Sequence, residues 1–175
     1  MTADTRPARA RPAAVSDAAA IAGIYNQGIE DRVATFETEP RSAEQITRWF
    51  DGGRPIVVAE DADGAVVAFA SGSAYRDRPC YAGIAEFSVY VRRDWRGRGA
   101  GQVALAALIE AAGAAGQWKL VSRVFPENLA SRGLLRRMGF REVGIYRRHG
   151  LLDGVWRDCV IVERLLEPET PTADQ

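Results

Sequence analysis

A run of glycines and arginines between two apolar patterns constrains this chain more than any other feature. The segment from Arg96 to Gly101 reads RGRGAG, and it joins an alternating run at 86–91 to a helical pattern that Gly116 closes. Glycines let the backbone curl so that successive N–H groups point into one concavity. A helix start adds unpaired N–H groups and partial positive charge. The sequence therefore predicts a strand, a tight turn and a helix that bind a diphosphate, with arginines nearby to neutralise its charge: Arg92, Arg93, Arg96 and Arg98.

Several phosphate-binding motifs compete for this segment. A P-loop requires GxxxxGK[ST], and the only lysine of the chain, Lys119, is too far away to supply it. The spacing Gly99-x-Gly101-x-x-Ala104 does match the dinucleotide fingerprint, but that fingerprint expects an acidic residue roughly 20 positions later. The sequence there reads KLVSRV, without an acid. A further alternative is structural: the helix start needs glycines, and the arginines are solvated on the surface.

The remaining patterns predict a mixed order of strands and helices. Ser16 or Asp17 is expected to cap the first helix, and Ser42 with Gln45 forms a capping box for the second. Asn128 is expected to cap a later helix that Gly139 ends. The order β-α-α-β-β-β-α-β-α-β-β indicates the α+β (mixed α/β) class, with strands predicted at 9–15, 55–59, 66–71, 86–91, 120–125, 142–148 and 155–165.

Charge and cysteine usage exclude several classes of protein. Lysine plus arginine equals aspartate plus glutamate at 23 each, which argues against a nucleic-acid binder. Cys80 and Cys159 lie in no ligand spacing, so we expect reduced thiols and no metal site. The longest apolar stretch, 103–109, is too short to span a membrane, and no secretory signal is recognisable. We expect one cytoplasmic domain over 9–166, with flexible tails at 1–8 and 167–175.

Two motifs resemble the GNAT acetyltransferases. Arg96-x-x-Gly99-x-Gly101 matches their [QR]-x-x-G-x-[GA] turn, and Asn128-x-x-Ser131 followed by GF at 139–140 resembles their second conserved element. Across 9–165 the chain is similar to the branch that acetylates phosphinothricin, arsinothricin or methionine sulfone. The segments that carry this similarity are 24–30, 34–40, 86–91 and 154–158. The resemblance implies a GNAT fold, with a central twisted, mostly antiparallel sheet and helices on both faces, acetyl-coenzyme A as cosubstrate, and a homodimer.

The resemblance also implies where the acetyl donor binds. The main chain of Val89, Tyr90 and Val91 would pair with the pantetheine arm, and the Val89 N–H would point at the thioester oxygen. Asn128 would bind the same arm with Ser131 nearby; a plain helix cap would also explain Asn128, and both roles can hold at once. The diphosphate would be held by the glycine-rich turn, which consists of Arg96, Gly97, Arg98, Gly99, Ala100, Gly101 and Gln102.

On the acceptor side, the resemblance implies that Glu86 is the general base, acting directly or through a water. The alternative is an ordinary polar residue on the solvated face of a strand. Arg76 and Arg78 are expected to clamp an acidic substrate, unless their loop is simply a solvated surface. Phe36 is expected to form one wall of the pocket. Tyr146 is the phenol that we nominate as the general acid that protonates the leaving thiolate.

Two features limit the resemblance. Close relatives often carry a histidine where this chain has Leu135, so any role of that histidine is absent here. The only histidine, His149, does not replace it by motif and is expected on the surface, whereas Trp156 and Asp158 receive no chemical role. The predicted function is N-acetylation of a small amino acid-like compound. The alternatives are acetylation of a peptide or protein, and a coenzyme A-binding sensor without catalysis.

Overall fold

The computed structural model describes residues 7–166; most of the two expected tails lies outside this range. Eleven main elements follow one another in the predicted order, so the α+β class is confirmed. They are β1 (Arg9–Pro12), α1 (Ala18–Asp31), α2 (Ala43–Thr47), β2 (Ile56–Glu60), β3 (Val66–Ala74), β4 (Ile84–Val91), α3 (Ala100–Ala114), β5 (Lys119–Val124), α4 (Leu129–Arg137), β6 (Arg141–Leu152) and β7 (Val155–Leu165).

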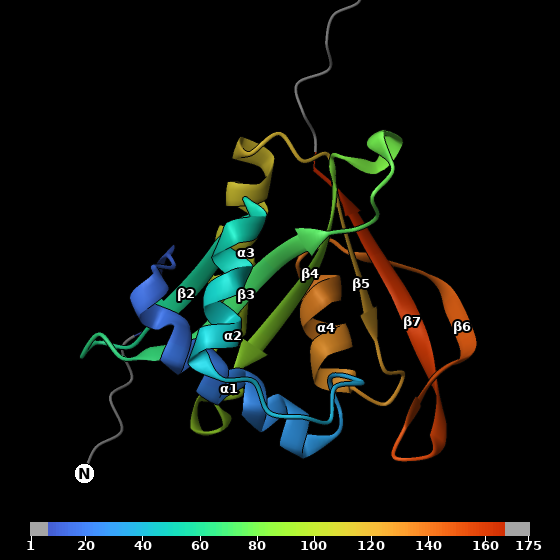
Figure 1. Ribbon diagram of the computed structural model, residues 1–175, viewed down its shortest axis with the longest axis horizontal. Helices are drawn as coiled ribbons and strands as arrows, with labels where there is room; N and C mark the ends of the chain where they lie inside the picture. The colour runs from blue at the N-terminus through green and yellow to red at the C-terminus, as the bar shows by residue number, and fades with distance from the viewer. Residues whose placement is uncertain (1–6, 167–175) are drawn as a thin grey trace, which may run out of the picture.

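The strands form one twisted sheet in the order β1-β2-β3-β4-β5-β7-β6 (Figure 1). All neighbours are antiparallel except β4 and β5, which are parallel. Parallel neighbours need a crossover connection, and the segment that contains α3 supplies it. The pairing of β4 with β5 ends at Glu86 and Val121, although both strands continue, to Val91 and Val124. The two strands therefore diverge and leave a gap in the sheet.

Helices cover both faces of the sheet, as the resemblance implied. On one face, Leu105 and Leu108 of α3 pack with Phe87 of β4 in the larger apolar cluster. On the other face, Ile21 of α1 belongs to a second cluster, against which Tyr90 packs. Phe87 and Tyr90 therefore lie on opposite faces of β4, which confirms the predicted alternation along this strand. The short helix α4 lies beside the gap between β4 and β5 (Figure 1).

The first strand and helix differ from the prediction in detail. β1 ends at Pro12 rather than at residue 15, because Val15–Asp17 forms a 3-10 turn. Asp17 precedes α1 but does not cap it; its carboxylate instead accepts from the Arg11 guanidinium at 2.7 Å and from the Ala14 N–H at 2.8 Å. The capping box ahead of α2 is confirmed, since Ser42 and Gln45 exchange side-chain to backbone hydrogen bonds.

The last hairpin is longer than predicted because a tight turn closes it. Asp153 and Gly154 have φ values of 49° and 76°, typical of a two-residue hairpin loop. β6 bulges around Arg148, whose φ is 48°. The Asp158 carboxylate accepts from the Arg148 N–H at 2.7 Å and so stabilises this bulge, which gives Asp158 a structural role. Within residues 7–166, no helix is both long and apolar enough to cross a membrane.

Candidate functional site

The gap between β4 and β5 exposes one edge of β4. The Arg92 N–H donates to the Val67 carbonyl at 2.8 Å. Because hydrogen bonding alternates along an antiparallel strand, the N–H groups of Val89 and Val91 turn away from β3 and toward the gap. The Phe87 carbonyl agrees with this alternation, since it accepts from the Ser122 hydroxyl across the gap at 2.8 Å. β4 therefore offers backbone donors and acceptors to an extended ligand.

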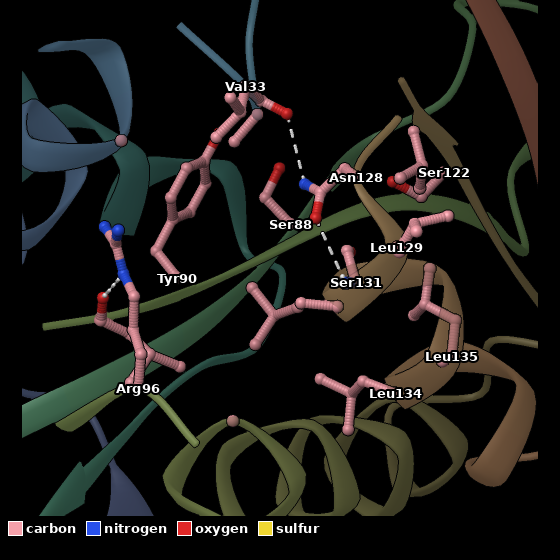
Figure 2. A pocket seen from close by; sticks show the side chains of 18 of the residues that line it. Val33, Ser88, Tyr90, Arg96, Ser122, Asn128, Leu129, Ser131, Leu134 and Leu135 are labelled. Atoms are coloured by element: carbon pink, nitrogen blue, oxygen red, sulfur yellow. Dashed lines mark hydrogen bonds between the residues drawn. The ribbon is translucent and has the colours of Figure 1, made fainter. Parts of the chain in front are cut away.

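A cavity of about 520 Å³ occupies this gap. Asn128 stands on its rim: its amide nitrogen donates to the Val33 carbonyl at 3.1 Å, and its oxygen caps α4 by accepting from the Ser131 N–H at 3.1 Å (Figure 2). The predicted helix cap is thus confirmed. The predicted donor-binding residues that line the cavity are Val89, Tyr90, Val91, Arg96, Gly97, Gly99, Gly101, Gln102, Asn128 and Ser131, whereas Arg98 and Ala100 lie outside the lining.

The glycine-rich turn ends in a set of unpaired amides. Gly97 and Gly99 have φ values of 76° and 84°. This left-handed backbone conformation is strained for residues that carry a side chain, but not for glycine. The first i to i−4 hydrogen bond of α3 runs from the Val103 N–H to the Gly99 carbonyl at 3.1 Å, so residues 100–102 have no acceptor within the helix. Donors of this kind at a helix start suit an anion.

Gly101 allows the parts of the site to approach closely. A Cβ at this position would lie 3.0 Å from Val91 and 3.3 Å from Leu134. The absence of a side chain therefore lets α3 begin directly against β4 and α4. Leu135, at the position of the family histidine, is 2% exposed and belongs to the apolar lining of the cavity.

Most of the arginines near the turn already have partners. Arg96 pairs with Asp31 at 2.6 Å, and Arg93 reaches the same carboxylate at 2.7 Å. Burial would raise the pKa of Asp31, but its hydrogen bonds to Arg93 and Arg96 outweigh this and hold the pKa below its usual value. Arg92 pairs with Asp94 at 2.7 Å, and Arg98 lies over the Trp95 ring. Asp31 lines the cavity, and its role was not predicted because α1 is distant from the turn in sequence.

On the acceptor side, Glu86 lies at the point where β4 and β5 separate. Arg123 of β5 donates from Nη2 to both Glu86 oxygens, at 2.6 and 2.7 Å. The two residues are 37 positions apart, so only the strand register reveals their contact, and no sequence pattern singles out Arg123. Arg123 lines the cavity.

The other residues predicted on the acceptor side lie outside the cavity lining. Arg76 and Arg78 are exposed and stack on Tyr75 and Tyr81 of their own loop, at 5.2 and 5.8 Å. The Phe36 ring instead packs edge-on against Phe125 at 5.0 Å between ring centres.

The two tyrosines with predicted roles differ in environment. Tyr90 is partly buried and packs against Gly28 of α1, and desolvation raises the pKa of its phenol, which therefore stays neutral. Tyr146 is 53% exposed on β6, with its ring beside His149 at 4.8 Å; His149 is exposed on the same strand, as expected. Among residues 7–166, no group of three or more His, Cys, Asp or Glu side chains is placed to hold a metal ion.

Known proteins that are similar to this chain are acetyltransferases. The sequence profile of the acetyltransferase (GNAT) family matches residues 23–140. The chain is 38% identical to the L-methionine sulfoximine/L-methionine sulfone acetyltransferase of Pseudomonas paraeruginosa, over 90% of this chain and 94% of the relative. It is 33% identical to the phosphinothricin N-acetyltransferase of Streptomyces coelicolor, over 93% of this chain and 98% of that protein. The crystal structure of a GNAT superfamily phosphinothricin acetyltransferase from Sinorhizobium meliloti in complex with AcCoA superposes with a TM-score of 0.87 at 31% identity, covering 97% of this chain and 94% of that one.

Proposed function

Because this chain belongs to the GNAT acetyltransferase family, we propose that it transfers the acetyl group of acetyl-coenzyme A to the amino group of a small amino acid-like acceptor. The observation that carries this proposal is one cavity that joins two features. These are a strand edge on which the N–H groups of Val89 and Val91 face the gap, and the unpaired amides that follow Gly99. An extended arm that ends in a diphosphate fits both features at once.

The residues that would hold the acetyl donor follow from this geometry. The amides of 100–102 and the Arg96 guanidinium would hold the diphosphate. For this, the ion pair between Arg96 and Asp31 would have to break. Asn128 has both polar atoms engaged, with Val33 and Ser131, so its proposed contact to the pantetheine arm would use a remaining lone pair or hydrogen. When bound, acetyl-coenzyme A supplies an activated thioester carbonyl. The Val89 N–H would stabilise the negative charge that develops on that carbonyl oxygen.

The acceptor side of the proposal requires proton removal. An amine attacks a carbonyl only in its neutral form, whereas most amino groups are protonated near neutral pH. Glu86 stands on the same strand as Val89, three residues earlier, and would take the proton directly or through a water. We assign no general acid, since Tyr146 is half exposed and lies outside the cavity lining.

The names of the relatives suggest the acceptor class. By these names, the relatives act on L-methionine sulfoximine, L-methionine sulfone and phosphinothricin. This supports an acceptor with the backbone of an amino acid, and it also supports a role in detoxification or resistance. Cys80 and Cys159 are unpaired thiols, which supports a reducing compartment such as the cytoplasm.

A thiol-release assay tests the proposal. Purified protein with acetyl-coenzyme A would be given L-methionine sulfone, L-methionine sulfoximine, phosphinothricin, arsinothricin and a set of peptides. We expect turnover of at least one amino acid analogue and none of the peptides. Turnover of peptides alone would favour a peptide acetyltransferase, and tight donor binding without any turnover would favour a sensor.

The proposal includes self-association through β6 and β7. Ile145 pairs with Val160, and Leu151 pairs with Trp156. Because side chains alternate along β7, Trp156 and Val160 share one face, so Ile145, Leu151 and Trp156 lie on that face together. They are 56%, 52% and 55% exposed. An apolar surface of this kind on the outer strands of the sheet supports a homodimer.

A further inference from the structure

The proposed base, Glu86, is engaged in an ion pair with Arg123. Glu86 and Val121 are the last paired residues of β4 and β5, and Arg123 lies two residues further along β5, on the same face as Val121. One guanidinium nitrogen, Nη2, bridges both carboxylate oxygens at 2.6 and 2.7 Å. The pair therefore stands where the gap opens, and each charge neutralises the other.

Arg123 has bonding capacity to spare. Within residues 7–166, its hydrogen bonds go to Glu86 alone, and they use a single nitrogen of the guanidinium. A guanidinium has five donor hydrogens in a planar fork that matches a carboxylate. The side chain is 42% exposed and lines the cavity. Arg76 and Arg78, by contrast, lie outside that lining and stack on tyrosines of their own loop.

We propose that Arg123 binds the carboxylate of the acceptor and, by doing so, releases Glu86 to act as the base. This inference rests on the proposed function, because it assigns the acceptor's anionic group to a residue of the same site. The exchange replaces one guanidinium–carboxylate contact with another, so Arg123 remains neutralised throughout. Glu86 then takes one proton from the ammonium group, which leaves a neutral amine with its lone pair free to attack.

The charges explain why such an exchange would select the acceptor. An amine without a carboxylate binds as a cation. To reach Glu86 it would have to break the Glu86–Arg123 ion pair, and the Arg123 guanidinium would then be left unpaired beside another positive charge. An amino acid carries its own carboxylate beside the ammonium group, so both of its charges find partners. Arg123 would therefore favour acceptors with an anion next to the amine and disfavour the same amine without one.

The experiment compares two acceptors in three enzymes. L-methionine sulfone and its descarboxy analogue, 3-(methylsulfonyl)propylamine, differ only in the carboxylate. Wild type, Arg123→Gln and Arg123→Lys would be assayed by thiol release with both, and the ratio of their kcat/KM values gives the preference for the carboxylate. We expect Arg123→Gln to lower this ratio about tenfold or more, the usual contribution of a hydrogen bond to a charged group. Arg123→Lys, which keeps the positive charge, should restore part of it.

Arg141→Gln is the matched control, because Arg141 also forms a cross-strand ion pair, donating to Glu163 at 2.8 Å, and lies away from the gap. It should leave the ratio as in wild type. If Arg123→Gln slows both acceptors equally, or changes neither, Arg123 is only a structural partner of Glu86 and the inference is overturned, while the acetyltransferase assignment stands. If wild type acetylates neither acceptor nor any other amino acid analogue, the proposed function fails and this inference fails with it.

Discussion

At the scale of single residues, the proposed acceptor side of the site depends on a carboxylate held by a neighbouring cation. Glu86 is 29% exposed and engages Arg123 through both oxygens. A polar residue on a strand that faces solvent needs no such partner. The contact at the opening of the gap gives this glutamate a defined position next to the free edge of β4, where the proposed base would have to stand.

Glu86→Gln tests the proposed base directly. The amide keeps the size of the side chain but cannot take the proton, so we expect kcat to fall about 100-fold or more. The dissociation constant of acetyl-coenzyme A, measured by calorimetry, should stay the same, because Glu86 is not among the residues that line the donor cavity. Glu142→Gln, which alters another arginine-paired glutamate, is the control. An unchanged kcat in Glu86→Gln would remove this residue from the mechanism.

Gly99 carries the second prediction at this scale. Its φ of 84° disfavours any side chain, so Gly99→Ala should destabilise the fold by about 1–2 kcal/mol and weaken acetyl-coenzyme A binding. Gly113→Ala is the control within the same helix, because a Cβ there meets nothing within 4 Å. That change should stabilise the fold by about 0.5–1 kcal/mol. Urea unfolding and calorimetry measure both variants, and equal behaviour of the two would contradict the role of the turn.

At the scale of elements, the start of the chain is held by an ionic network. Arg11 of β1 contacts Asp17 at 2.7 Å and Glu60 of β2 at 2.6 Å. Arg11 hydrogen-bonds to Asp17 and thereby holds the pKa of this carboxyl below its usual value of 3.8. The folded protein therefore binds the Asp17 proton more weakly than the unfolded chain does. The stabilisation is complete above that value and is lost as the pH falls through the folded pKa.

Asp17→Asn should therefore be destabilising only where the carboxyl is charged. We expect a loss of about 1.5–3 kcal/mol in the free energy of unfolding at pH 7, typical of a hydrogen bond to a charged group. The difference from wild type should shrink as the pH falls below 3.8. Urea unfolding at a series of pH values measures it. A difference that stays constant down to pH 2 would mean that Asp17 stabilises the fold through something other than its charge.

The elements themselves were largely predictable, for reasons that lie in local sequence. Capping residues such as Ser42 and Asn128, and turn glycines such as Gly139, act over a few positions, and the structure confirms them. Asp17 was misassigned because its carboxylate has a long-range partner, Arg11, that no local pattern reveals. Arg123 and Asp31 were missed for the same reason: each meets its partner only after strands or helices distant in sequence are brought together.

At the scale of the whole molecule, the outer strands carry an exposed apolar face. The proposed dimer would cover Ile145, Leu151 and Trp156, which lie together on this face. A double variant, Ile145→Glu with Trp156→Glu, places charges there and should convert a dimer to a monomer. Light scattering after size-exclusion chromatography gives the mass of each. Val15→Glu, an exposed apolar residue at the other end of the sheet, is the control. A wild type that elutes as a monomer at all concentrations would rule the dimer out.

β4 and β5 pair over only three residues each, and this short seam has a consequence for how such a scaffold evolves. The crossover that makes these strands parallel begins at the open end of the gap, where β4 ends and α3 starts, so the unpaired amides and the opening arise from the same connectivity. In the proposed binding mode, the diphosphate of the donor is held near Gly99 and its thioester lies where the seam ends. Substitutions around the end of the seam can therefore retune which acyl chain or which amine is accepted, without disturbing the anchor.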